Sequence, residues 1–227
     1  VLYWFTYNDE GAQDWYVAVG NIEGRRIIFE QLIRVSGGEF GEGFDPAKIE
    51  RMPVGSAAFT WNDCETAFMD WFLEERHGRQ DLVRLAALDG LGCGMPKDLT
   101  SQPQGQFSGS WYDPTHDGEG FIVEMLATGE PLVYWFSYSP EGQRRWYFGV
   151  GEVREGKLIV DEMFTTEGAR FGMDFNPADV QVKPWGSLEL DLNCSQGTAT
   201  YSSVEPGFGS GSQNLIRLTT LDGLSCP

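Results

Sequence analysis

The chain has little histidine and no catalytic signature built on it. Only two histidines, His77 and His116, occur among 227 residues. The sequence contains no GxSxG and no HExxH pattern and no cysteine–histidine pairing, which are typical of nucleophilic or zinc-dependent hydrolases. We therefore interpret the protein as non-catalytic. The one enzymatic alternative is a glycosidase that uses a pair of carboxylates, because that chemistry needs no histidine.

Long hydrophobic runs and an excess of basic residues are also missing. No stretch approaches the roughly 18 apolar residues of a membrane helix, so the sequence predicts no membrane insertion. The chain carries 34 Asp and Glu against 16 Lys and Arg, a net charge of −18. A surface of this charge repels nucleic acid, and we expect no nucleic-acid partner.

The chain does contain a long internal repeat. The phrase LYWFTYNDEGAQDWYVAVG at residues 2–20 is echoed by VYWFSYSPEGQRRWYFGVG at residues 133–151, an offset of 131. LDGLGC at residues 88–93 is likewise echoed by LDGLSC at residues 221–226. Solenoid units are shorter, about 20 to 50 residues, so this period indicates duplication of a whole domain.

The two copies differ at their beginnings. The second copy is preceded by GSWYDPTHDGEGFIVEM (Gly109–Met125), which has no counterpart before the first. We place the first domain at residues 1–93, a polar linker at 94–105 and the second, complete domain at 106–227. The first domain is expected to lack its first two strands, which leaves two unpaired sheet edges. Residues that precede Val1, or a separate segment, are expected to complete it.

Strand signals dominate both copies. Aromatic and β-branched runs are separated by Gly, Pro, Asn and Asp. The second copy is predicted to hold eight strands, at 108–112, 120–125, 132–138, 145–153, 157–165, 187–193, 198–202 and 214–220. The first is predicted to hold six, at 2–7, 14–19, 26–34, 56–63, 66–72 and 82–87. This order predicts an all-β fold of tandem antiparallel meanders, most simply eight-stranded up-and-down β-barrels, with β-sandwiches as the alternative.

Four cysteines occupy equivalent places in the two copies. Of the three possible connectivities, the repeat favours Cys64–Cys93 and Cys194–Cys226, one disulfide in each domain. Each bridge closes a loop of about 30 residues and should stabilise its domain by about 3–4 kcal/mol. Disulfides imply an oxidising compartment, so we expect a secreted protein, extracellular or periplasmic.

Several separated motifs carry a resemblance to a known kind of domain. GSWYDP with GEGF, the phrase YWF(T/S)Y, and a Cys followed by a late RL and a closing Cys occur in order. Together they resemble a repeat domain of uncharacterised secreted proteins of proteobacteria. The resemblance covers nearly the whole chain and implies a secreted bacterial β module without a known activity. With avidin- and lipocalin-like barrels, the chain shares only the strand count and an opening G-x-W.

Large residues occupy both faces of the repeated aromatic strand. In VYWFSY, Tyr134, Phe136 and Tyr138 share one face, whereas Trp135 lies on the other. One face is therefore expected to be core and the other to be covered or exposed, either as a contact between the domains or as a ligand surface.

Aromatic side chains are also the candidate binding residues. They could stack on sugar rings or on an apolar ligand, although core packing is the alternative because most recur in both copies. The candidates are Trp4, Trp15, Trp111, Tyr112, Trp135 and Trp146. We expect a recognition module for an extracellular glycan or protein. The alternative is a structural subunit of an extracellular assembly or filament, a homo-oligomer or polymer completed by strand donation.

One loop gathers candidate metal ligands. Asp113, Asp117 and Glu119 lie within seven residues of one another, with His116 between them. Carboxylate oxygens are the ligands that Ca²⁺ prefers, although the spacing is not that of an EF-hand. The alternative is a simple turn, because Asp-Pro and Asp-Gly pairs form turns. No cofactor other than this candidate Ca²⁺ is expected.

Overall fold

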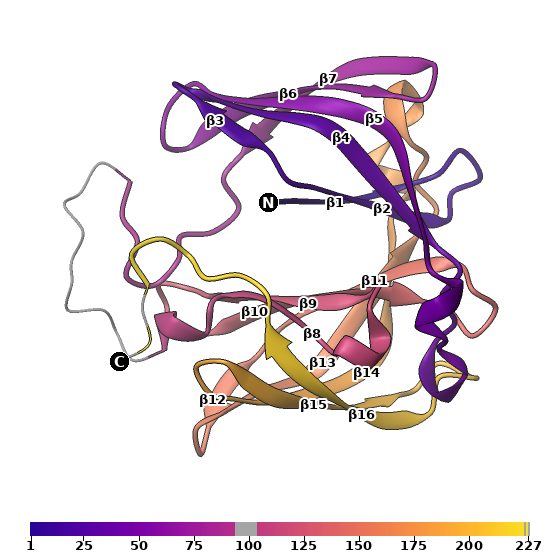
Figure 1. Ribbon diagram of the computed structural model, residues 1–227, viewed down its shortest axis with the longest axis vertical. Coiled ribbons are helices and arrows are strands. Elements are labelled where there is room, and N and C mark those ends of the chain that lie inside the picture. The colour runs from indigo at the N-terminus through magenta and orange to yellow at the C-terminus, as the bar shows by residue number, and fades with distance from the viewer. Residues whose placement is uncertain (94–103, 225, 227) are drawn as a thin grey trace.

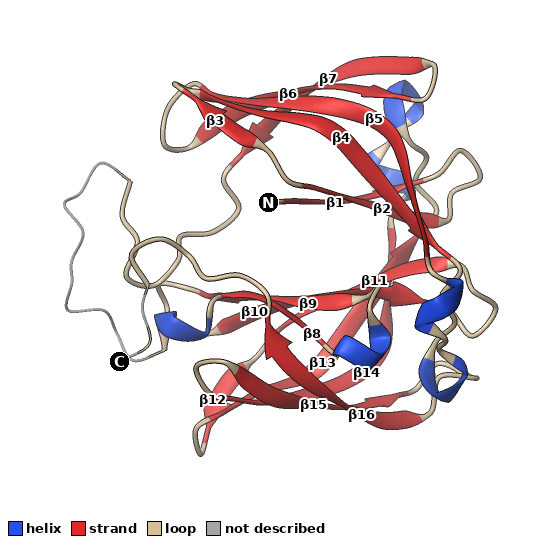
Figure 2. Cartoon of the chain, in the orientation of Figure 1, coloured by secondary structure: helices blue, strands red, loops and turns tan. Residues whose placement is uncertain are grey.

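The protein is built from two β-sheets, one in each repeat. The computed structural model describes residues 1–93, 104–224 and 226. The first sheet lies above the second in Figure 1, and only short helical turns interrupt the strands (Figure 2). The predicted all-β fold of antiparallel meanders is confirmed. Within the described residues no helix combines the length and the apolar character that crossing a membrane requires.

The second sheet is a closed barrel. Eight antiparallel strands follow one another around it, and a short ninth, β12, pairs only with β13. The ring closes between β11 and β13, where Phe148 pairs with Phe164, and β16 pairs with β8. Its strands are β8 (Gly109–Tyr112), β9 (Gly120–Met125), β10 (Pro131–Tyr138), β11 (Arg144–Val150), β12 (Glu152–Arg154), β13 (Lys157–Glu167), β14 (Gln181–Leu192), β15 (Gln196–Ser203) and β16 (Ser210–Arg217).

The first sheet is a half-barrel. Its order is β1-β2-β4-β5-β6-β7, with β3 paired only to β4, so β1 and β7 are its edges. Among the described residues, no counterpart of β8 or β9 pairs in this sheet. Its strands are β1 (Leu2–Tyr7), β2 (Gln13–Ala18), β3 (Asn21–Glu23), β4 (Arg26–Ser36), β5 (Glu50–Trp61), β6 (Thr66–Leu73) and β7 (Arg76–Val83).

Most predicted strands are present, and the errors have physical causes. The bounds of β1 and β9 agree with the predictions. The strand predicted over 82–87 is wrong, because β7 begins at Arg76. Its sequence RHGRQDLV is polar on both faces, as suits a sheet edge, and gives little alternation to detect. The strand predicted over 145–153 divides into β11 and β12, with Gly151 between them.

Bulges bend the longest strands of both sheets. The register of β4 shifts opposite Gly55 on β5, and that of β13 shifts opposite Gly186 on β14. A Cβ atom at Gly55 would lie 2.0 Å from the Phe72 carbonyl oxygen, and one at Gly186 would lie 2.1 Å from that of Ser202. Only glycine permits this approach, which explains its recurrence at equivalent positions.

The two disulfides agree with the pairing that the repeat predicted. Cys64 is bonded to Cys93 and Cys194 to Cys226, with Cα atoms 5.7 and 5.6 Å apart. Each bridge joins a β-turn to the segment that follows the last strand of its sheet. Most of the predicted linker, residues 94–103, lies outside the described residues.

Among the described residues, six 3₁₀-helices occupy the connections between strands. They are η1 (Gly41–Gly43), η2 (Pro46–Lys48), η3 (Gly105–Phe107), η4 (Pro114–His116), η5 (Gly172–Asp174) and η6 (Pro177–Asp179). The pairs η1–η2 and η5–η6 are equivalent in the repeat. Each pair follows a phenylalanine, Phe40 or Phe171, that lies in the core of the opposite domain.

The exchange of these phenylalanines is reciprocal. Phe40 packs in the barrel among Trp135 and Phe208, with ring centroids 5.3 and 4.7 Å away. Phe171 packs in the half-barrel against Trp4 and Trp71, at 5.5 and 4.9 Å. The two domains therefore share their cores.

The outward faces of the repeated aromatic strands form the rest of the interface. Tyr3 contacts Phe136 and its counterpart Tyr134 contacts Phe5, with centroids 5.2 and 5.4 Å apart. The contact of each residue is thus returned by its equivalent, the pattern of an isologous dimer within one chain. Of the alternatives for the two faces of this strand, the structure has one face in the barrel core and the other covered by the first domain.

Candidate functional site

Most of the aromatic candidates lie in the interior. Trp111 and Trp135 are 1% and 0% exposed in the barrel, Trp4 is 8% exposed in the half-barrel, and Trp15 is 1% exposed between the domains. None of these four indoles lies on the outer surface, although Trp15 and Trp111 line one cavity and Trp4 lines another. Because these side chains are buried, core packing rather than ligand binding explains why they recur in both copies.

The remaining two candidates are half-buried. The Nε1 of Trp146 donates to the carbonyl of Thr6 at 3.3 Å, and its ring packs against Phe5 across the domain interface. Tyr112 lines a cavity between the domains. The structure does not bring the six predicted residues together in one surface, so a single aromatic platform is not formed.

The carboxylates of the acidic loop, Asp113 and Asp117, already have partners within the protein. One Asp113 oxygen accepts from the Thr115 amide and hydroxyl, and the other accepts from the Asn214 amide at 2.9 Å. Asp117 pairs with Arg51 at 2.8 Å. The described part of the chain contains no group of three His, Cys, Asp or Glu side chains that could hold a metal ion. The turn alternative explains Asp113, which caps η4.

Glu119 is a buried carboxyl within the barrel. Gln213 Nε2 donates to Oε1 at 2.6 Å, and the Ser137 hydroxyl donates to Oε2. Burial raises the pKa of Glu119 to about 7, a shift that these two donors oppose and the charge of Asp113 assists. The carboxyl links β9 to β10 and β16, the strands that flank the leading hairpin.

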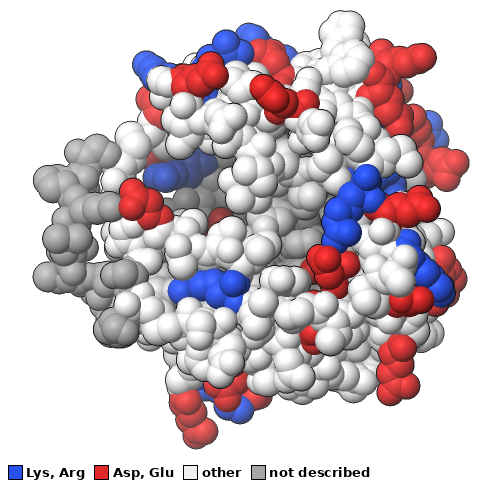
Figure 3. All heavy atoms as spheres, viewed as in Figure 1, with Lys and Arg blue, Asp and Glu red and all other residues white. Residues whose placement is uncertain are grey.

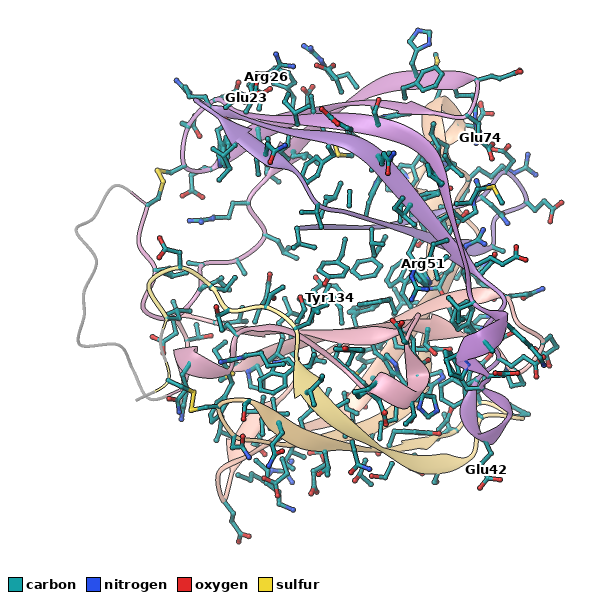
Figure 4. All side chains as sticks on the ribbon, viewed as in Figure 1. Glu23, Arg26, Glu42, Arg51, Glu74 and Tyr134 are labelled. Carbon is teal, nitrogen blue, oxygen red and sulfur yellow. A yellow bond between two sulfur atoms is a disulfide. The ribbon has the colours of Figure 1, made fainter. Side chains whose placement is uncertain are left out.

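A cavity of about 440 Å³ lies between the domains. Its walls are largely apolar, from Tyr3, Trp15, Val17, Val35 and Phe136, and Figure 3 shows this face of the molecule hollowed between the two sheets. Several of its polar groups are paired with one another: the Tyr3 hydroxyl donates to Ser110 Oγ at 2.9 Å, and Arg51, labelled in Figure 4, binds Asp117. The Tyr112 hydroxyl, which also lines this cavity, makes no hydrogen bond among the described residues.

The second cavity, of about 530 Å³, lies on the open side of the half-barrel. It is lined by both edge strands and by the loop after Phe171, with Thr6 and Tyr7 from β1 and Gly78 and Gln80 from β7 among its walls. Its floor is the aromatic core of the half-barrel, including Trp4 and Trp71. The cavity therefore lies at the position that corresponds to the β8–β9 hairpin of the barrel.

Equivalent residues of β7 and β16 differ in burial because β7 borders the open side of the half-barrel, whereas β16 pairs with β8. Gln213 is 6% and Leu215 1% exposed, whereas their counterparts Gln80 and Leu82 are exposed and half-buried. In the barrel, β8 and β9 stand between β16 and β10. Within the described residues, no strand pairs with the outer edge of β1 or of β7. The open side presents unpaired backbone groups next to an apolar floor.

The sequence analysis did not predict the residues of this site. Thr6 and Gln80 are of common residue types, and Gln80 lies outside the strand that was predicted at 82–87. The available signal was the repeat itself, since RQDLVRL at residues 79–85 aligns with SQNLIRL at residues 212–218. Comparison of the chain with protein-family models, curated proteins and solved structures found no match.

Proposed function

We propose that this protein is a non-catalytic binding module that recognises a protein partner by adding the partner's β-strands to its open first sheet. One observation carries the proposal. Strands β1 and β7 each have a single neighbour among the main strands, whereas their repeat equivalents β10 and β16 have two. Exposed sheet edges beside an apolar groove are the surfaces to which extended peptides add, because main-chain hydrogen bonds supply affinity and side-chain pockets supply specificity.

The compartment of this function is extracellular or periplasmic. Both disulfides support it, because such bridges persist in oxidising surroundings and are rare in the cytosol. The acidic surface supports a partner that is neither nucleic acid nor anionic lipid.

Glycan recognition has weaker support. It requires exposed aromatic faces, and four of the six candidate side chains are at most 8% exposed. A glycan array probed with the full chain tests glycan recognition. Saturable binding that Trp146→Ala weakens would support this function. A carboxylate-pair glycosidase has weaker support still, because the oxygens of Asp113 and Glu119 are held by donors of the fold.

Strand addition is tested by photocrosslinking at the open edge. Peptides are first selected on the full chain from a displayed library of random sequences. With the photoreactive residue benzoylphenylalanine at the exposed position His77 on β7, we expect the selected peptides to crosslink to the protein. The same residue at exposed Gln31 on β4 is the matched control and should give no crosslink. Crosslinking at position 31 in place of position 77 contradicts the proposal.

A further inference from the structure

Two polar side chains face the open side of the half-barrel without a hydrogen-bond partner. Thr6 on β1 and Gln80 on β7 line the same cavity. Across residues 1–93, 104–224 and 226, neither the Thr6 hydroxyl nor the Gln80 carboxamide makes a hydrogen bond. Two such groups on opposite walls of one cavity are able to bind a third group placed between them.

The barrel shows what that third group is. Ser137 is the repeat equivalent of Thr6, and Gln213 is that of Gln80, since the two glutamines pair with equivalent residues in register. In the barrel both side chains donate to the carboxylate of Glu119. Glu119 immediately precedes β9 in the hairpin that the half-barrel lacks. The open side thus holds both donors for a carboxylate that a hairpin would bring.

A second pair of equivalents lies along β7. The Asn214 amide on β16 donates to Asp113 of the hairpin, and the equivalent amide on the open edge is that of Asp81. The Arg217 guanidinium lies 4.7 Å over the ring of Trp111, a cation–π contact. Its equivalent Arg84 is exposed and lies over no ring within the described residues.

At the domain interface, a third side chain has no equivalent of the hydrogen bond that its counterpart makes. Tyr3 donates its hydroxyl to Ser110 of the hairpin, 2.9 Å away. The equivalent Tyr134 lies between the domains, stacked on Phe5, and its hydroxyl has no hydrogen-bond partner among the described residues (Figure 4). The pseudo-two-fold relation would place a serine of an added hairpin at Tyr134.

We propose that the open side of the first sheet binds an added β-hairpin that carries the pattern of Gly109–Met125, with Ser-Trp on one strand and a carboxylate at the start of the other. This inference rests on the proposed strand addition and specifies the strands that are added. The carboxylate binds Thr6 and Gln80, and the indole lies under Arg84. The occupant is not the hairpin of a second copy, because that hairpin closes its own barrel and its loss would expose Trp111, now 1% exposed.

The probe is a synthetic peptide with the sequence Ser108–Met125, labelled with a fluorophore and titrated into the full chain. We expect saturable binding with one peptide per chain. A peptide carrying Glu119→Ala should bind about tenfold more weakly or worse, because it leaves two donors in the cavity unpaired. A peptide carrying Glu124→Ala is the matched control, since Glu124 makes no hydrogen bond in the described structure, and should retain affinity.

Substitutions in the acceptor locate the carboxylate. Thr6→Val with Gln80→Leu should weaken the wild-type peptide about tenfold and leave the Glu119→Ala peptide little changed. Gln31→Leu makes the same chemical change as Gln80→Leu on an exposed part of β4 and should have no effect. Equal losses for both peptides would show that the carboxylate binds elsewhere and would overturn the inference.

A fusion controls for a peptide that does not form a hairpin by itself. In it, the sequence Ser108–Glu130, hairpin and following turn, is joined before Val1. We expect a higher melting temperature than that of the chain alone, and loss of that gain with Glu119→Ala in the added segment.

No gain from the fusion together with no peptide binding overturns the inference. If library peptides still crosslink at position 77, strand addition stands and only the hairpin pattern fails. A dimer seen by light scattering, dissociated by the peptide, would identify a second copy as the occupant and also overturn it.

Discussion

At the scale of single residues, the same side chain has different surroundings in the two copies. Gln213 is buried against Glu119, whereas Gln80 is exposed in the open cavity. The repeat preserves both residues of the donor pair, but only the barrel contains their acceptor. The sequence identified Glu119 only as one of three candidate Ca²⁺ ligands. It placed it at a metal site because its true partners, Ser137 and Gln213, come from distant parts of the chain.

The buried carboxyl gives the barrel a pH dependence. In the folded protein the pKa of Glu119 is raised to about 7 by burial, whereas an unfolded chain loses the proton near pH 4.3. Between these values the folded state binds more protons, so the free energy of unfolding falls as pH rises, by about 4 kcal/mol in total. We expect Glu119→Gln to remove this fall between pH 5 and pH 8 in urea unfolding.

Glu50 provides the matched control for this prediction. It is an exposed glutamate on β5, and Glu50→Gln should keep the pH dependence of the wild type. If Glu119→Gln and the wild type lose stability in parallel from pH 5 to pH 8, Glu119 is ionised throughout that range and its burial has been misjudged.

At the scale of elements, the strands with aromatic cores were predictable and the edges and connections were not. Strand β9 was found within its true bounds because apolar residues mark it, whereas β7 was missed because an unpaired edge is polar on both faces. The sequence analysis predicted no structure for the segments of η1 and η5. It therefore did not predict the insertion of Phe40 and Phe171, a long-range contact that local patterning does not encode.

The inserted phenylalanines should be structural supports of the opposite domain. Phe40 belongs to the first repeat but is 7% exposed within the barrel core of the second. Phe40→Ala should lower the free energy of unfolding by about 3–5 kcal/mol, because it leaves a cavity among large aromatic rings. Guanidinium unfolding followed by tryptophan fluorescence measures the change.

Phe72→Ala is the control for this substitution. Phe72 lies on β6, is 49% exposed, and its truncation should change stability by about 0.5 kcal/mol or less. An equally small effect of Phe40→Ala would mean that the phenylalanine is not inserted in solution.

At the scale of the whole molecule, two copies of one domain pack as an internal dimer and differ in closure. The duplication and the disulfide pairing were readable from the sequence, because the offset of the repeat is nearly constant. The arrangement of the copies was not, since it depends on contacts between their outward faces. We infer that this asymmetry leaves an acceptor for strands between β1 and β7.

Hydrogen exchange of the backbone amides tests this claim most directly, because the second copy is an internal control. In the free chain, we expect the outward-facing amides of β1 and β7 to exchange rapidly while the equivalent amides of β10 and β16 are protected. Saturation with the Ser108–Met125 peptide should slow exchange in β1 and β7 and leave β10 and β16 unchanged. Protection of β1 and β7 in the free chain equal to that of β10 and β16 would contradict the account, since it would mean that the first sheet has no open side.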